Sequence, residues 1–227
     1  MPSPMQSPIV TTVAGREPPI AIYSLGQFEI LIQGIAVRMD GRGPKKPLEL
    51  LSILIVAGAR GAVVGTVADD LWPEADGFDA YRSLITTVYR LRRLLAYRDA
   101  VHLGTGRIRL DPTLCRVDVW QFEHALAAAR DREQLRAALA IYEGPFLEGS
   151  DNPWVVGMRT RLQHSVTHAV RTIGSSLPGA TGAATLEVVG SVGVSGLSRG
   201  DRRTGAAVRL LVQGDPVARH ELQSRGK

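Results

Sequence analysis

Apolar positions recur with a helical period over residues 80–97, and this stretch organises the rest of the chain. Four apolar residues at spacings of four, three and four predict the buried stripe of an α-helix. They are Leu84, Val88, Leu91 and Leu95. At about 100° per residue, the opposite side presents a polar, mostly cationic set. That set is Arg82, Thr86, Tyr89, Arg90 and Arg93. Asp79 is expected to cap the helix, since its carboxylate can accept a free backbone N–H of the first turn.

Two short β-prone runs follow this helix, at 101–103 and 107–110, and flank the turn Gly104-Thr105-Gly106, which predicts a hairpin. From Arg82 to Arg109 there are seven arginines and one acidic residue, a local net charge of +6. A helix with a cationic outer face followed by an arginine-bearing hairpin suits a DNA major groove and its phosphates. The alternative is that these charges only solvate the outer face of an amphipathic helix.

Upstream, three short β-prone runs predict a small antiparallel sheet with tight turns at Gly26-Gln27 and Gln33-Gly34. The runs are Ile20–Leu25, Phe28–Ile32 and Ile35–Val37. Pro47 is expected at the first position of a buried helix, which is apolar on nearly every side and ends at Gly58 and Gly61. A shorter helix is expected over 66–72. The order of sheet, three helices and hairpin predicts an α+β fold, a winged helix-turn-helix with an N-terminal antiparallel sheet and a C-terminal wing hairpin.

Composition changes this picture in two ways. The chain has 24 Arg against 3 Lys, and a net charge of +5. A GC-rich genome produces such a skew without any functional reason, which weakens arginine content as evidence. The single cysteine, Cys115, excludes an intramolecular disulfide and a cysteine-built zinc site, and fits a reducing compartment. With no secretory signal and no apolar run near the roughly 20 residues of a membrane span, the expected location is the cytoplasm, without a membrane partner.

Catalytic chemistry finds little support, so neither an enzyme nor a cofactor is expected. His164 and His168 have a metal-compatible spacing, but no third ligand accompanies them, and a solvated helix face explains them. Gly104 and Gly106 lack the third glycine and the strand–helix crossover of a dinucleotide site. Cys115 is expected to be packed rather than nucleophilic.

Several motifs, in order along the chain, resemble one known family. In the predicted winged helix they are Leu25-Gly26-Gln27-Phe28, Lys46-Pro47-Leu48-Glu49-Leu50-Leu51, Leu71-Trp72-Pro73-Glu74-Ala75-Asp76 and Val88-Tyr89-Arg90-Leu91-Arg92-Arg93-Leu94-Leu95. Further on they are Val117-Asp118-Val119-Trp120-Gln121-Phe122-Glu123, Leu139-Ala140-Ile141-Tyr142-Glu143-Gly144-Pro145-Phe146-Leu147 and Pro153-Trp154. Over residues 20–175 the chain resembles the Streptomyces antibiotic regulatory protein family, which are transcriptional activators of actinobacteria.

The resemblance implies an OmpR-type winged helix followed by a helical, tetratricopeptide-like bacterial transcriptional activator domain. It stops near Ile173-Gly174, so that domain is expected to be truncated. The expected organisation is a disordered arm (1–19), the DNA-binding domain (20–112), a partial activator domain (113–175) and an irregular tail (176–227). The tail has nine glycines and no aromatic residue, and a frameshift is one explanation. Helices are expected near 118–130, 132–142 and 154–173, with an apolar face left unpaired because repeat hairpins bury their surfaces against neighbours.

Beside the helix set Arg82, Thr86, Tyr89, Arg90 and Arg93, three more basic residues are candidates for DNA contact. Arg107 is expected at the wing tip, entering the minor groove. Lys45 and Lys46 are expected before a helix N-terminus, which favours a phosphate. For each, a solvated surface role is the alternative. In the family, the loop between the second and third helices contacts RNA polymerase, which implies a contact through Trp72, Glu74, Asp76 and Asp79. The alternative for Trp72 is a place in the core.

The expected function is therefore a sequence-specific DNA-binding transcriptional activator of a secondary-metabolite (antibiotic) gene cluster. It is expected to bind promoter direct repeats as a head-to-tail homodimer and to recruit RNA polymerase. The alternative is a winged-helix module whose arginine face docks an acidic protein surface without binding DNA.

Overall fold

The computed structural model describes residues 17–38 and 44–174. The helices are α1 Lys45–Ala57, α2 Val64–Leu71, α3 Gly77–Leu94, α4 Asp118–Ala128, α5 Arg132–Leu139 and α6 Pro153–Gly174. The strands are β1 Ile20–Tyr23, β2 Glu29–Ile32, β3 Ile35–Ala36, β4 Ala62–Val63, β5 Val101–Gly104, β6 Arg107–Leu110 and β7 Cys115–Val117. The expectations for the arm and the tail lie outside the described residues. Of the helices in the described ranges, none combines the length and hydropathy of a membrane span.

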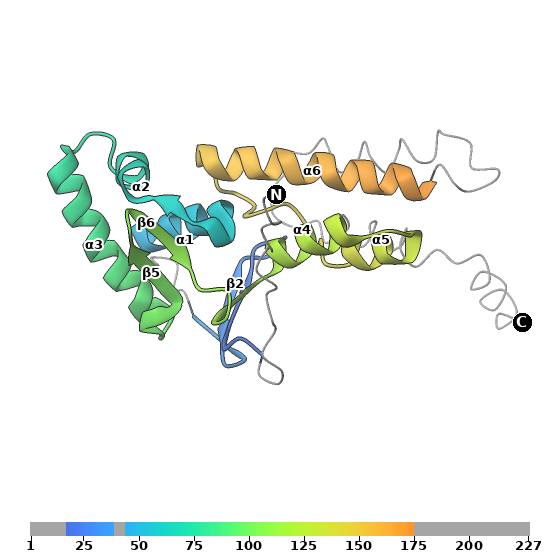
Figure 1. Cartoon of the computed structure of the whole chain (residues 1–227), viewed down its shortest axis with the longest axis horizontal. Coiled ribbons are helices and arrows are strands. Elements are labelled where there is room, and N and C mark those ends of the chain that lie inside the picture. The colour runs from blue at the N-terminus through green and yellow to red at the C-terminus, as the bar shows by residue number, and fades with distance from the viewer. Residues whose placement is uncertain (1–16, 39–43, 175–227) are drawn as a thin grey trace, which may run out of the picture.

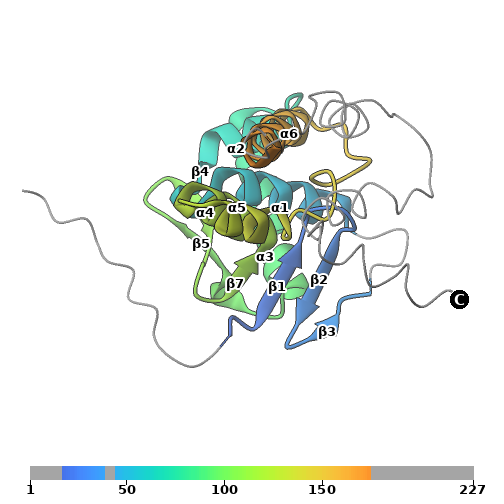
Figure 2. The same cartoon turned by 90° about the vertical axis from the view of Figure 1, so that its right-hand side faces the viewer.

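The predicted α+β winged helix with a following helical region is confirmed. Figure 1 shows α3 and the β5–β6 hairpin at one end of the molecule, with α4, α5 and α6 extending away from them. The buried helix α1 lies at the centre, as its sequence predicted, with Leu50, Leu51, Leu54 and Ile55 almost fully buried. Figure 2 shows the first sheet on one side of α1 and α6 on the other.

The first sheet is mixed rather than purely antiparallel, with strand order β3-β2-β1-β7. β1 pairs antiparallel with β2, but it pairs parallel with β7, with Ile20 opposite Cys115. The three predicted strands pair antiparallel as expected, and β7 is a fourth, parallel strand that the sequence did not predict. After the wing, the chain returns to the edge of the first sheet. A strand of three residues is too short to be predicted from the alternation of apolar and polar positions.

The turn at Gly26-Gln27 is also wider than predicted, because Tyr23 pairs with Glu29 and five residues connect the two strands. Ser24 and Leu25 leave the ladder since their backbone N–H groups donate to the buried carboxylate of Asp118, at 2.7 and 2.8 Å. The Gln33-Gly34 turn is a two-residue hairpin turn as predicted, with φ of 50° and 82°. Such positive φ values are typical of the hairpin turns that favour glycine.

The wing is a three-stranded sheet of order β4-β6-β5, in which β4 is a strand that the sequence did not predict. Ala62 pairs with Ile108 of β6. The preceding residue, Gly61, has a φ of 66°, and a Cβ there would overlap the backbone of Ile108. Only glycine fits this position, where the chain leaves α1 and passes against the wing.

Helix boundaries differ from the predictions at two functionally relevant places. The first helix begins at Lys45, so Pro47 is its third residue and not its first. The helix predicted over 80–97 is α3, which begins at Gly77 and ends at Leu94. Asp76 is its N-cap, not Asp79, because the Asp76 carboxylate accepts the N–H of Asp79 at 2.9 Å.

The expected unpaired apolar face on the following helices is not found in the described region. Among its large apolar side chains in α4, α5 and α6, only Val156 is substantially exposed. The apolar residues of α6, such as Val155, Met158 and Leu162, are buried in the same core cluster as α1. These helices therefore bury their surface against one another and against α1 and the first sheet, which together replace the neighbouring repeat that the prediction required.

Candidate nucleic-acid interface

The outer face of α3 is built by the register of its buried residues. Ala80, Leu84, Val88 and Leu91 pack inward, and Leu95 continues this row just past the helix. The five residues predicted for the groove all lie on the exposed side; they are Arg82, Thr86, Tyr89, Arg90 and Arg93. The structure therefore brings these five candidates together on one face, although contact with DNA itself stays a prediction.

The arginines of that face are not engaged by acidic groups. Within the described residues, no ion pair involves Arg82, Arg90 or Arg93. The guanidinium of Arg82 lies 5.7 Å from the ring centroid of Phe78, one turn earlier. Free guanidinium groups on an exposed helix face have their five N–H donors available for phosphate or for guanine O6 and N7.

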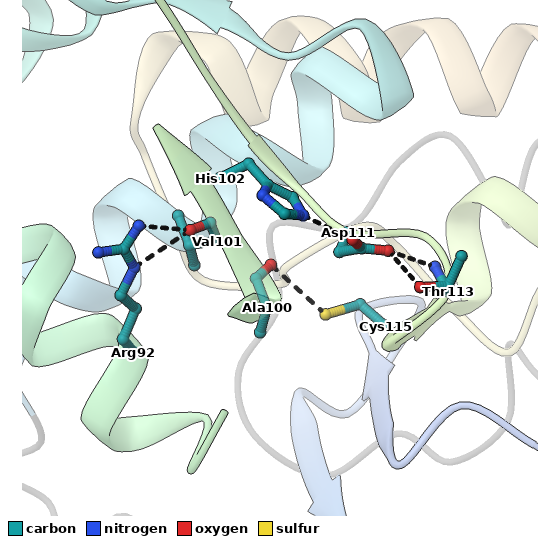
Figure 3. A network of polar contacts seen from close by, with 7 residues as sticks. All are labelled: Arg92, Ala100, Val101, His102, Asp111, Thr113 and Cys115. Carbon is teal, nitrogen blue, oxygen red and sulfur yellow. Dashed lines mark hydrogen bonds and ion pairs between the residues drawn. The ribbon is translucent and has the colours of Figure 1, made fainter. Parts of the chain in front are cut away.

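Other arginines of the +6 stretch have structural partners. Arg92 donates through Nε and Nη2 to the carbonyl oxygen of Val101, at 3.1 and 2.7 Å, and so fixes the C-terminal part of α3 to β5 (Figure 3). Arg107 donates to the carbonyl oxygens of Arg60 and Gly61, at 3.0 and 2.8 Å. Its side chain is therefore held along the wing, and its entry into a minor groove stays a prediction.

A second cationic surface lies on the wing. Arg60, Arg107 and Arg109, together with His102, line an open hollow of about 360 Å³. Arg60 and Arg109 are not among the site residues predicted from the sequence. Arg109 could have been predicted from the sequence, since it lies on the strand after the hairpin turn. Arg60 could not, because it reaches this surface only through the pairing of β4 with β6.

The base of the wing is held by a polar network around Asp111 (Figure 3). His102 Nε2 lies 2.6 Å from the Asp111 carboxylate, which also accepts the backbone N–H and the hydroxyl of Thr113. Burial alone would raise the pKa of Asp111, but these hydrogen bonds and the nearby His102 together hold it below its ordinary value of 3.8. The carboxylate is therefore charged at neutral pH and fixes the end of β6.

Cys115 belongs to the same region and is packed, as predicted. Its Sγ is buried and donates weakly to the carbonyl oxygen of Ala100, at 3.9 Å. Burial raises the pKa of this thiol to about 12, and the nearby Asp111 charge acts in the same direction. A thiol that stays protonated at neutral pH is a poor nucleophile.

The two lysines predicted to favour a phosphate occupy the first two positions of α1, not the residues before it. Lys46 Nζ donates to the carbonyl oxygen of Leu71 at 2.7 Å, pairs with Glu49 at 2.9 Å and lies 5.5 Å from the Trp72 ring centroid. It therefore joins α1 to the end of α2. Lys45 keeps a side chain that is 86% exposed, with a long 3.8 Å approach to Glu49.

The predicted polymerase-contact residues lie in and beside the loop between α2 and α3. Trp72 is partly buried against the core, as its alternative interpretation held. Glu74, Asp76 and Asp79 are all exposed, and Asp76 is occupied as the cap of α3. The structure thus leaves two carboxylates of this group, Glu74 and Asp79, without a structural task in the described region.

Comparison with known proteins adds three findings. The bacterial transcriptional activator domain model matches residues 117–184. The regulatory protein AfsR of Streptomyces griseus is 30% identical over 131 residues, covering 53% of this chain. The resemblance to the Streptomyces antibiotic regulatory protein family is confirmed. The matched domain is described as a transcriptional activator domain, and the relative as a regulatory protein.

The fold is similar to that of a solved structure. A structure of Mycobacterium tuberculosis EmbR, in complex with a low-affinity phosphopeptide, superposes with a TM-score of 0.55 at 20% identity. The match covers 88% of this chain and 66% of that one. The chain spans only 13% of the length of AfsR.

Proposed function

We propose that this protein is a sequence-specific DNA-binding transcriptional activator of the antibiotic regulatory type, acting in the bacterial cytoplasm at the nucleoid. The activator-domain match and the similarity to AfsR support the regulatory class. The finer assignments are a secondary-metabolite gene cluster as target, promoter direct repeats as sites and RNA polymerase as partner. They rest on the family resemblance and on the surfaces described above.

One observation carries the DNA-binding assignment: the exposed face of α3 holds three arginines that no acidic side chain neutralises within the described residues. In a winged helix of this order, α3 is the element that fits the major groove, which admits an α-helix. The wing hollow with Arg60 and Arg109 then provides a second cationic surface for backbone phosphates.

The polymerase contact is assigned to the exposed acidic residues Glu74 and Asp79, beside Trp72, at the opposite end of α3 from Arg93. A loop at that end remains accessible when the helix lies in a groove. Binding to direct repeats implies a head-to-tail contact between two protomers, in which each uses a different surface.

The test is binding of the full chain to a fluorescent duplex from its own upstream region, measured by anisotropy as salt is varied. If five or six cations each displace a counterion, log affinity should fall with log salt with a slope of about −5 per bound protomer. The double variant Arg90→Gln with Arg93→Gln should reduce the slope by at least about one unit, because Arg90 is expected to contact a phosphate. Arg38→Gln with Arg98→Gln makes the same charge change on exposed residues away from that face and should alter the slope little.

A slope near zero, or equal affinity for an acidic polypeptide, contradicts DNA binding. Equal affinity for the polypeptide would favour the alternative of a winged-helix protein-interaction module. A scrambled duplex of the same length measures how much of the affinity depends on sequence.

A further inference from the structure

An apolar row runs along one side of the cationic face of α3, and the cationic contacts proposed above leave it largely unexplained. Phe78 is 70% exposed, Ile85 38% and Tyr89 62%. Their spacings of seven and four residues place them on one side of the helix. Tyr81, at 47% exposure, flanks the row.

Such exposure is concentrated on this helix. Seven large apolar side chains are exposed among the described residues, and four of them belong to α3; the others are Ile35, Val63 and Val156. Single exposed apolar residues are ordinary, but a contiguous exposed set marks an interaction site. The row therefore points to a partner that presents apolar groups to α3.

The surroundings of the row restrict that partner. Arg82 lies over the Phe78 ring at 5.7 Å, and Arg93 and Thr86 flank Tyr89 on the same exposed side. An apolar strip bordered by unneutralised guanidinium groups complements a surface that is anionic and yet displays apolar groups. The DNA major groove has this character, since its phosphates are anionic and the C5-methyl of thymine is the apolar group on its floor.

We propose that Ile85 and Tyr89 recognise thymine in the major groove by packing against its C5-methyl groups, with the flanking arginines engaging phosphate or guanine. This rests on the proposed DNA binding and deepens it, because it names the base that the centre of α3 selects. The two side chains are one turn apart, about 6 Å along the axis, so they reach the same short run of base pairs.

The test replaces each thymine of the upstream duplex in turn by deoxyuridine, which removes the methyl group and keeps the base-pairing edge and the charge. Anisotropy with the full chain should show affinity falling about fourfold at one or two positions, the effect of losing one buried carbon. Ile85→Ala should bind the thymine duplex several-fold more weakly and lose its sensitivity to uracil at one of these positions. Tyr89→Ala should do so at another, if both residues act as proposed.

Val156→Ala is the matched control, since it shortens an exposed apolar side chain on α6, away from α3. It should keep both the affinity and the uracil sensitivity of the parent protein. Circular dichroism of each variant checks that the fold is intact, which is expected because all three side chains are exposed.

Three results would overturn the proposal. Full replacement of thymine by uracil without loss of affinity shows that no methyl group is recognised. Equal uracil sensitivity in the parent, Ile85→Ala and Tyr89→Ala proteins assigns the effect to the duplex and not to these residues. Variants that bind the thymine duplex normally but fail to activate transcription assign the row to a protein partner. Absence of any duplex binding at low salt is a different failure, which removes the proposed function and the thymine recognition with it.

Discussion

Arg93 and Arg90 occupy different places on the exposed face of α3. At about 100° per residue, Arg93 lies about 170° from the centre of the buried row and Arg90 about 110° from it. Arg93 therefore projects into the middle of the face, beside Tyr89, whereas Arg90 lies at its border. Both residues are exposed and free of ion pairs within the described region.

We expect Arg93→Ala to weaken binding to a matched site by about 1–3 kcal/mol and to relax the preference at one base pair. Arg90→Ala should weaken matched and scrambled duplexes alike, as expected for a phosphate contact. Competition binding with matched and scrambled duplexes distinguishes the two outcomes. Arg98→Ala, beyond the end of α3, is the control and should have little effect. If both α3 variants keep the parent's discrimination, the helix is not the element that selects sequence.

The Asp111 carboxylate predicts an acid-dependent loss of stability. Because its pKa is held below 3.8 in the folded protein, its contribution is present above that value and is lost as pH falls through the lower, folded-state pKa. Asp111→Asn should lower the free energy of unfolding at neutral pH and reduce its decline between about pH 5 and pH 2. Urea unfolding at a series of pH values measures this. Asp99→Asn removes an exposed carboxyl, and its free energy of unfolding should vary with pH as that of the parent protein does. If the stability of Asp111→Asn declines at low pH as steeply as that of the parent, Asp111 is not the source of the acid-dependent loss.

At the scale of the element, the start of α3 depends on a cap and not on hydrophobic periodicity. Gly77, Phe78 and Asp79 form its first turn and are exposed, so they contribute nothing to the buried stripe. The sequence offered two aspartates three residues apart, and the periodic pattern favoured the later one. The structure selects Asp76 because its extended conformation, with φ of −66° and ψ of 159°, directs its carboxylate to the Asp79 N–H.

We therefore expect Asp76→Ala to destabilise the protein by about 1 kcal/mol, the usual effect of losing an N-cap. Because this cap fixes the first turn of the proposed reading helix, DNA affinity should fall as well. Glu74→Ala removes an exposed charge from the same loop without removing a cap, so its midpoint of urea unfolding should equal that of the parent protein. Equal effects of the two substitutions would assign the loss to charge and not to capping.

The elements that the sequence predicted are those whose burial pattern is local. The stripe of α3, the apolar helix α1 and the hairpin turn within Gly104-Thr105-Gly106 each follow from residues close together in the chain. The strands β4 and β7 were missed because two or three residues carry no period, and their partners, Ile108 and Ile20, are distant in the sequence.

The same limit applied to the candidate site. Helical spacing alone placed Arg82 and Arg93 on the exposed face, but charge alone could not separate them from Arg92, Arg107 and Lys46. Those three donate to backbone carbonyl groups of other elements. Their partners are set by tertiary packing, which the composition of a basic stretch does not encode.

At the scale of the whole molecule, α1 joins the proposed DNA-binding face to the helical region. One side of α1 packs against α3 and the wing, and α6 packs along it as well. Two tryptophans anchor the helical region to it: Trp154 Nε1 donates to Ser52 Oγ at 2.9 Å, and Trp120 Nε1 donates to the Ile55 carbonyl oxygen at 2.8 Å. A shared core of this kind makes the described residues one cooperative unit, so a change at the junction should affect the whole.

Asp118 can test whether the described residues unfold as one unit. It lies at the start of α4, and its carboxylate binds Ser24 and Leu25, which follow β1. Its buried carboxylate accepts the N–H and hydroxyl of Ser24 and the N–H of Leu25, at 2.6 to 2.8 Å. Asp118→Ala removes the side-chain acceptor of three backbone N–H groups, those of Ser24, Leu25 and Val119, so we expect the free energy of unfolding to fall by about 3 kcal/mol.

Ser24→Ala removes only the hydroxyl and should cost about 1 kcal/mol, which makes it the matched control. Urea unfolding followed by both Trp fluorescence and circular dichroism should show one coincident transition at a lower midpoint for Asp118→Ala. Below that midpoint, affinity for the upstream duplex should equal that of the parent, since Asp118 does not contribute to the exposed face of α3. Two separate transitions, or a parental midpoint, would show that the sheet and the helical region fold independently, and the single-core interpretation would then be wrong.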